Sequence, residues 1–151
     1  MKKTTHSMIG LATGAALATY FNQPLPAGDL LTAIENTLPV FGMIALTGWG
    51  ALMPDWDIKL GLKHRGPTHT LIALGLLALL CYVIAPREWW FYLPAGYASH
   101  LLADMLTISG IPLFAPLIHV NVRLAPLRTG GIVDHLLGAA AAVLFVWLLW
   151  K

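Results

Sequence analysis

The stretch IVDHLLGAAAAVLFVWLLW, residues 132–150, decides the class of fold. It contains no lysine or arginine, and its length suits a helix that crosses a bilayer, which takes about 20 apolar residues. Its polar side chains, Asp134 and His135, stand near its beginning, whereas Trp147 and Trp150 stand at its end. Tryptophan at one end of an apolar helix is typical of a membrane span that reaches the headgroup region.

The composition extends this interpretation to the whole chain. Of the 151 residues, 58% are hydrophobic and 11% are charged, whereas about 25% are charged in a typical soluble domain. The net charge is +2 and no basic tract occurs, so nucleic acid is not a predicted partner. Cys81 is the single cysteine and has no disulfide partner within the chain. We therefore expect one integral-membrane domain over residues 1–151, with the lipid bilayer as its main partner.

Four further apolar stretches precede residues 132–150. They are residues 7–21, 38–53, 70–85 and 89–108. The last of these is long enough to span by itself, and the other three need flanking residues to do so. A shorter segment, 111–120, contains two prolines and is predicted to be re-entrant or interfacial. The predicted fold is all-α: a polytopic membrane helical bundle with about four to five transmembrane helices.

Basic residues set the expected orientation. If the N-terminus is cytoplasmic and five helices alternate, seven of the nine basic residues fall on the cytoplasmic side, and Arg87 and Lys151 fall on the other. The N-terminus resembles a signal peptide, but His6 interrupts its apolar run, so we expect a retained first helix. The sequence thus predicts a multi-pass membrane protein with a cytoplasmic N-terminus and its C-terminus on the other side.

Small residues recur four positions apart in two of the apolar stretches. The pairs are Gly10 with Gly14 and Gly138 with Ala142. This spacing predicts close helix–helix contacts. Glycine is also common in membrane helices generally, and the spacing alone leaves both interpretations open.

The predicted topology gathers every histidine on one side, although only lysine and arginine were used to set it. The residues that gather there are His6, Asp55, Asp57, His64, His69, His100, Asp104, His119, Asp134 and His135. Ionisable groups at membrane depth are costly, and by default they mark a functional site.

Spacing within this group favours a metal site. His100 and Asp104 are four apart and share one face of a helix. His64 and His69 are five apart, which suits one residue in a loop and the other in the first turn of the next helix. Histidine with carboxylate is the ligand set of zinc and similar metals, with about four ligands per ion. The set therefore predicts one to three divalent ions, zinc or alternatively manganese.

Other interpretations of these residues stay open. His100 and Asp104 can form a hydrogen bond that packs two helices. The loop that carries Lys59, Lys63 and Arg65 can bind lipid headgroups. His119 and His135 are best interpreted as structural residues rather than as metal ligands.

Four motifs resemble a known family. They are LMPDWD at 52–57, HRGPTHT at 64–70, GYASHLLADMLT at 96–107 and GIPLFAPL at 110–117. Together they are similar to the YdjM-like bacterial inner-membrane proteins, which are described as predicted membrane-bound metal-dependent hydrolases. His100 and Asp104 also resemble the H-x3-D pair of zinc-dependent phospholipases C, which is a more distant likeness.

The resemblance implies roles for particular residues. Thr5 with His6 matches the N-terminal histidine of the family, and the PDWD, HRGPTH and SHLLAD segments match its other motifs. Asp134 stands where family members often have glutamate. The expected metal ligands are His6, Asp55, His69, His100 and Asp104. Asp57, His64 and Asp134 are expected to be catalytic, bridging or supporting residues, and Arg65 is expected to hold a substrate anion.

The resulting hypothesis is a membrane-bound metal-dependent hydrolase, with its site at the cytoplasmic ends of the helices and a phospholipid or another phosphoester as substrate. The alternative is a non-catalytic membrane protein with a structural metal, or with a cytoplasmic face that binds lipid or a partner. A metal transporter would need polar residues through the whole bilayer, and the outer halves of these helices have almost none.

Overall fold

The computed structural model describes residues 1–21, 30–61 and 64–150. Lys63 and Lys151, which count in the orientation argument, lie outside the described residues. The described residues form six α-helices and a short 3-10 helix: α1 (Lys3–Tyr20), α2 (Leu30–Gly50), α3 (Trp56–Lys59), η1 (Pro67–His69), α4 (Leu71–Ile84), α5 (Tyr92–Met105) and α6 (Ile132–Trp150). The prediction of an all-α fold is confirmed for these residues.

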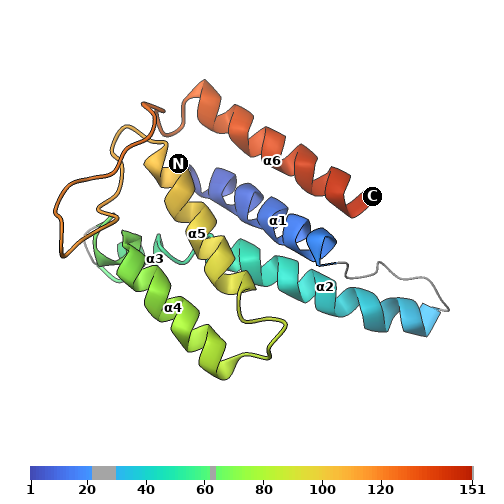
Figure 1. Cartoon of the computed structure of the whole chain (residues 1–151). Coiled ribbons are helices and arrows are strands. Elements are labelled where there is room, and N and C mark those ends of the chain that lie inside the picture. The colour runs from blue at the N-terminus through green and yellow to red at the C-terminus, as the bar shows by residue number, and fades with distance from the viewer. Residues whose placement is uncertain (22–29, 62–63, 151) are drawn as a thin grey trace.

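The long helices alternate in direction along the chain (Figure 1). Helices α1, α4 and α6 run one way, whereas α2 and α5 run the other way. Helix α1 packs against α2, α5 and α6, and α5 also packs against α2 and α4. As a result, the beginnings of α1, α4 and α6 and the ends of α2 and α5 lie toward the same end of the bundle.

Glycines allow these helices to approach closely. A Cβ atom added at Gly10 of α1 would lie 3.1 Å from the backbone oxygen of Thr47 in α2. A Cβ atom at Gly96 of α5 would overlap the same Thr47 carbonyl, and one at Gly138 of α6 would lie 3.2 Å from the hydroxyl oxygen of Thr5. The predicted helix contacts at Gly10 and Gly138 are therefore present, and the backbones of α1, α2 and α5 nearly touch.

The helix lengths differ from the apolar stretches in the sequence. Among the described helices, α6 is the one whose length and composition suffice to cross a membrane, and α4 is apolar but shorter. The expectation that residues 89–108 form a full-length span is wrong, because α5 has only 14 residues. Its C-terminal end is fixed by Thr107, whose hydroxyl donates to the Asp104 carbonyl at 2.8 Å. Helix α1 instead begins four residues before its apolar stretch, at Lys3.

Large apolar side chains cover the outer faces of α4 and α6. Leu76 and Val83 of α4 are 63% and 72% exposed, and Val143 of α6 is 69% exposed. A soluble monomer rarely leaves such continuous apolar surfaces in contact with water. These faces therefore fit a lipid environment better than an aqueous one.

The connection between α5 and α6 is irregular. Isolated bridges pair Thr107 with Leu127 and Ile111 with Val122, and the backbone N–H of Leu71 donates to the Leu113 carbonyl at 2.9 Å. These contacts hold the connection against α4 and α5. The segment predicted to be interfacial, 111–120, lies in this connection and forms no helix there.

Candidate metal centre

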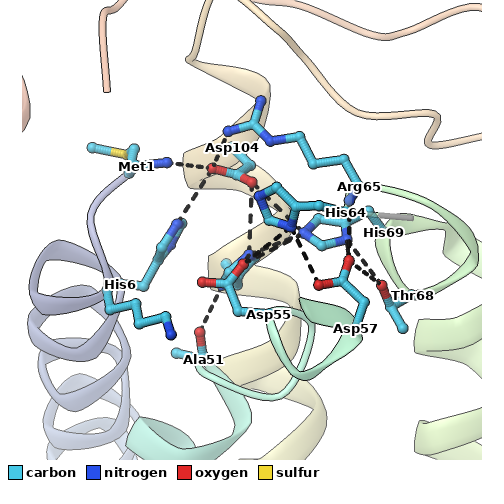
Figure 2. A network of polar contacts seen from close by, with 12 residues as sticks. Met1, His6, Ala51, Asp55, Asp57, His64, Arg65, Thr68, His69 and Asp104 are labelled. Carbon is cyan, nitrogen blue, oxygen red and sulfur yellow. Dashed lines mark hydrogen bonds and ion pairs between the residues drawn. The ribbon is translucent and has the colours of Figure 1, made fainter. Parts of the chain in front are cut away.

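Seven of the predicted site residues converge at the end of the bundle where the helix termini meet (Figure 2). They come from separate segments: His6 from the first turn of α1, Asp55 and Asp57 from the start of α3, His64 and His69 from the turn before α4, and His100 and Asp104 from the last turns of α5. Six of them are buried, and the side chain of His64 is 45% exposed. The predicted gathering of these residues is confirmed.

Two imidazole nitrogens face each other at the middle of the cluster. The Nε2 atoms of His69 and His100 are 3.3 Å apart. The Nδ1 atom of His100 lies 2.7 Å from the Ala51 carbonyl oxygen, which can only accept, so Nδ1 carries the proton and the neutral ring has a lone pair on Nε2.

The same reasoning applies to His69. Its Nδ1 lies 3.0 Å from the Thr68 hydroxyl, which itself donates to Asp57. Nδ1 of His69 is therefore the donor, and its Nε2 also has a lone pair. Burial lowers the pKa of His69 to about 4 against the opposing effect of Asp104 and Asp57, so the ring is neutral at pH 7. Two neutral rings with facing lone pairs form an arrangement that a bound cation stabilises.

Two carboxylates complete a cage around these nitrogens. Asp104 Oδ2 lies 3.7 Å from each of the two Nε2 atoms. Asp55 Oδ1 lies 3.6 Å from Nε2 of His100 and 4.0 Å from Nε2 of His69. Four ligands at zinc bonding distances form a tetrahedron with edges of about 3.4 Å. The five distances, from 3.3 to 4.0 Å, are close to that value. His69, His100 and Asp104 form one group that could hold an ion, and Asp55 belongs to two neighbouring groups, one with His6 and His100 and one with His64 and His69.

His6 adds a fifth donor residue, and the third histidine, beside this cage. Its ring stacks on that of His100, with centroids 3.7 Å apart, and its Nε2 lies 3.3 Å from Asp104 Oδ1. The N-terminal amino group of Met1 donates to the same oxygen at 2.6 Å. Nδ1 of His6 is buried and has no hydrogen-bond partner among the described residues. An orphaned buried nitrogen is costly, and a cation beside His6, Asp55 and His100 would satisfy it.

Asp57 organises the more exposed side of the cluster. Its Oδ1 lies 3.2 Å from Nδ1 of His64, and its Oδ2 accepts from the Arg65 backbone at 3.0 Å and from Thr68 at 3.2 Å. Burial would raise the pKa of Asp57, but the hydrogen bonds from His64 and Arg65 outweigh it and lower that pKa. For Asp55, burial dominates and raises the pKa. The lowered pKa keeps Asp57 ionised as a carboxylate. Burial disfavours the ionised form of Asp55, so a positive charge nearby would stabilise that form.

Arg65 is tied to α5. Its guanidinium donates to Asp104 Oδ1 at 3.2 Å, to the Thr107 hydroxyl at 2.8 Å and to the Gly110 carbonyl at 3.0 Å. Its backbone has φ of 59°, a left-handed conformation that costs energy for a residue with a side chain. These contacts use three of its five N–H groups, which leaves two for another anion.

Asp134 lies apart from this cluster. Its Oδ2 accepts from the backbone of Lys2 at 3.0 Å and of Gly130 at 2.7 Å, and its carbonyl accepts from the Thr5 hydroxyl. It therefore holds the beginning of α1, the helix that carries His6. His135 is exposed and contacts Lys2 and the Gly131 carbonyl, so it is also outside the cluster.

Three supporting groups were not assigned a role from the sequence. They are the Thr68 hydroxyl, the Ala51 carbonyl and the Tyr97 hydroxyl, which donates to the Thr68 carbonyl. Tyr97 lies three residues before His100 on the same helix face, and that spacing could have identified it. A backbone carbonyl such as that of Ala51 leaves no signal in the sequence.

A cavity of about 950 Å³ adjoins the cluster. His64, Arg65 and Thr68 line it on the side of the cluster, and Leu76 of α4 and Pro116 line it farther away. His119, predicted to be structural, also faces this cavity. The site is therefore open on one side, next to its most exposed histidine.

Comparison with known proteins gives a family. The inner membrane protein YdjM of Escherichia coli (strain K12) is 38% identical over 97 residues, which is 58% of this chain and 46% of that protein, and YdjM of Shigella flexneri gives the same values. The inner membrane protein YbcI of Escherichia coli (strain K12) is 34% identical over 77 residues, 40% of this chain and 44% of that protein. The chain thus spans less than half the length of these relatives.

No solved structure matches the chain. The likeness to zinc-dependent phospholipases C accordingly stays a prediction from the spacing of His100 and Asp104. The profile of the family described as YdjM inner membrane protein, in contrast, matches residues 1–151, the full length of the chain. The match includes every histidine and aspartate of the cluster, and the chain belongs to the YdjM family of inner membrane proteins.

Proposed function

We propose that this protein is a membrane-bound metal-dependent hydrolase that acts on a phospholipid or another phosphoester. The observation that carries the proposal is the cage of His69, His100, Asp55 and Asp104 beside a half-exposed His64 and an open cavity. A purely structural metal site is closed, with four ligands and no access for substrate. More donors than one ion needs, together with access from one side, favour catalysis.

Within this proposal, His6, Asp55, His69, His100 and Asp104 hold one to three divalent ions, zinc or manganese. A bound ion of this kind supplies Lewis acidity, which lowers the pKa of a water molecule to about 7 and polarises a phosphoryl oxygen. Asp104 holds the cage together, because its two oxygens contact His69 and His100 on one side and His6 and Arg65 on the other.

The remaining residues move the proton and hold the anion. Asp57 accepts the Nδ1 proton of His64 and fixes the tautomer, which leaves Nε2 of His64 free to take a proton from the attacking water. The two unused N–H groups of Arg65 can bind the phosphoryl oxygens, because the planar guanidinium fork matches phosphate geometry.

The topology in this proposal is one integral-membrane domain over residues 1–151, with about four to five spans and a cytoplasmic N-terminus. The 14 residues of α5 would need flanking residues to cross the bilayer. The alternating directions of α1, α2, α4, α5 and α6 support it, as do the exposed apolar faces of α4 and α6. Lys2 directly precedes α1, Arg65 contacts Asp104 of the cluster, and Arg128 lies four residues before α6. The site then lies at headgroup depth on the cytoplasmic side.

Replacement of His64 by glutamine is expected to abolish most turnover without removing the metal. Loss of a general base lowers kcat by about 100- to 10,000-fold, and the cage does not require His64. The assay compares wild type with His64→Gln on chromogenic phosphomonoesters and phosphodiesters and on phospholipid vesicles, with metal content measured in parallel. His135→Gln, a histidine outside the cluster, is the matched control. If metal-loaded wild type hydrolyses none of these substrates, the non-catalytic alternative replaces this proposal.

Asp134 has a supporting role in the proposal, and two variants test it. Asp134→Ala leaves the Lys2 and Gly130 amides without an acceptor and is expected to lower the free energy of unfolding by about 1–3 kcal/mol. Asp134→Asn keeps an acceptor oxygen and is expected to retain both stability and activity. Denaturant unfolding and kcat are measured for both variants. An inactive but stable Asp134→Asn protein would show instead that Asp134 acts as a base.

A further inference from the structure

We propose that the cavity beside the metal centre holds the hydrocarbon chain of an anionic membrane lipid, with its phosphate group at His64 and Arg65. Only the statement that this lipid is the substrate rests on the function proposed above. Occupation of the cavity by the lipid stands on the geometry of the cavity and of α4.

The cavity has a polar part and an apolar part. His64, Arg65 and Thr68 form the polar part, since each of them also contacts Asp57 in the cluster. Ile72 and Leu76 line it farther along α4. Leu76 lies five residues beyond Leu71, the first residue of α4, which is about 8 Å along the helix axis. A ligand that fills the cavity therefore meets charge at one end and hydrocarbon at the other.

The apolar wall continues beyond the cavity along α4. Ile72, Leu76, Leu79 and Val83 recur at helical spacing and are exposed. From Ile72 to Val83 this stripe covers about 17 Å, which is the scale of a lipid acyl chain. Because the chain belongs to a family of inner membrane proteins, hydrocarbon covers this stripe, and the cavity opens where the stripe meets the cluster.

The second wall of the cavity explains why a lipid fits better than another protein surface. Pro112, Ala115 and Pro116 of the irregular connection also line the cavity, together with the polar residues Ser109, His119 and Asn121. Contact with a second copy of this chain would cover the outer face of α4 but would not fill the space behind it. The volume of about 950 Å³ is at the upper end of the range for small-ligand sites, about 300–1,000 Å³. A flexible hydrocarbon chain can enter such a space from the bilayer.

The polar end favours an anionic headgroup. The Arg65 guanidinium is permanently charged and retains two unused N–H groups, and His64 is half-exposed beside it. The nearby aspartates are engaged by His64, Arg65, Thr68 and the cage histidines. A phosphate group there completes the hydrogen bonds of Arg65, whereas a neutral lipid leaves them to water.

The test is photo-crosslinking of the full chain in nanodiscs of phosphatidylethanolamine that contain a phosphatidic acid probe with a diazirine in its acyl chain. Peptide mapping by mass spectrometry is expected to place the label in residues 109–121 and at Leu76. Leu76→Trp fills the cavity and is expected to reduce the label in residues 109–121 by roughly tenfold. Leu79→Trp is the matched control, because Leu79 is exposed on α4 but does not line the cavity, and its label is expected to equal that of wild type.

The outcomes separate this inference from the proposed function. Labelling requires no turnover, so a labelled cavity in a protein that hydrolyses nothing would support the inference and refute the hydrolase. Label confined to the outer faces of α4 and α6, and equal in wild type and Leu76→Trp, would overturn the inference even if the protein hydrolyses soluble phosphoesters. A diacylglycerol probe that labels residues 109–121 as strongly as phosphatidic acid would overturn the assignment of an anionic headgroup.

Discussion

Protein with His100 replaced by alanine is expected to lose its bound metal on purification, whereas wild type retains one to three equivalents. The substitution removes one corner of the cage and leaves the Nε2 atom of His69 without its opposing lone pair. It also removes the ring on which His6 stacks. Loss of an outer-shell partner alone costs about 10–100-fold in metal affinity, so loss of a direct ligand is expected to cost at least about 100-fold. Turnover is expected to disappear with the metal.

Elemental analysis of detergent-purified protein measures this effect. His69→Ala is expected to behave like His100→Ala, because both remove an Nε2 ligand. His135→Ala is the matched control, since His135 is an exposed histidine whose side chain contacts Lys2 and the Gly131 carbonyl. Size-exclusion and circular dichroism profiles establish that each variant is folded. Folded wild type that was never exposed to chelator and carries no metal would contradict the proposed site.

Replacement of Gly96 by alanine is expected to lower stability strongly, because Gly96 has the tightest surroundings among the glycines that the structure describes. The new Cβ would overlap the Thr47 carbonyl and lie 3.0 Å from the backbone nitrogen of Ala51. Backbone atoms cannot rotate away as a side chain can, so α5 must move off α2. Overpacking of this kind costs about 3 kcal/mol. Because Asp55 follows α2 and His100 lies on α5, the same shift is expected to weaken metal binding.

Gly75 provides a matched control on α4. A Cβ atom at Gly75 meets nothing within 4 Å, so Gly75→Ala is expected to raise stability by about 0.5–1 kcal/mol through the better helix propensity of alanine. Thermal unfolding in detergent is compared for wild type and the two variants. Equal midpoints for Gly96→Ala and wild type would show that α2 and α5 are not packed as closely as described.

The helical class and the alternation of helices follow from the apolar stretches, but the helix ends do not. Residues 132–150 are apolar except for Asp134 and His135 near their beginning, and α6 has those bounds. Residues 89–108 are equally apolar, yet α5 stops at Met105 because hydrogen bonds to the Asp104 carbonyl and to Leu127 redirect the chain. Such contacts depend on residues far along the sequence, and hydropathy does not contain them.

The identity of most residues in the candidate site was predictable, because metal-ligand chemistry selects histidine and aspartate and the bias of basic residues places them at one end of the helices. The spacing of His100 and Asp104 placed them on one helix face, and the cluster contains both. The separate position of Asp134 was not predictable, because an acid at the start of a helix can point toward the cluster or toward the preceding backbone. The conformation of Arg65 was also hidden, since a positive φ at a residue other than glycine results from tertiary contacts.

Because the candidate cluster takes its donors from segments between His6 and Asp104, its groups of possible ligands become complete at different stages of synthesis. Asp55, His64 and His69 form one group, and all three precede α5 in the chain. The other two groups need His100, and one of them also needs Asp104, so they are complete only after α5 has been synthesised. Under the proposed function, the groups that include residues of α5 can therefore hold a metal only once that helix exists.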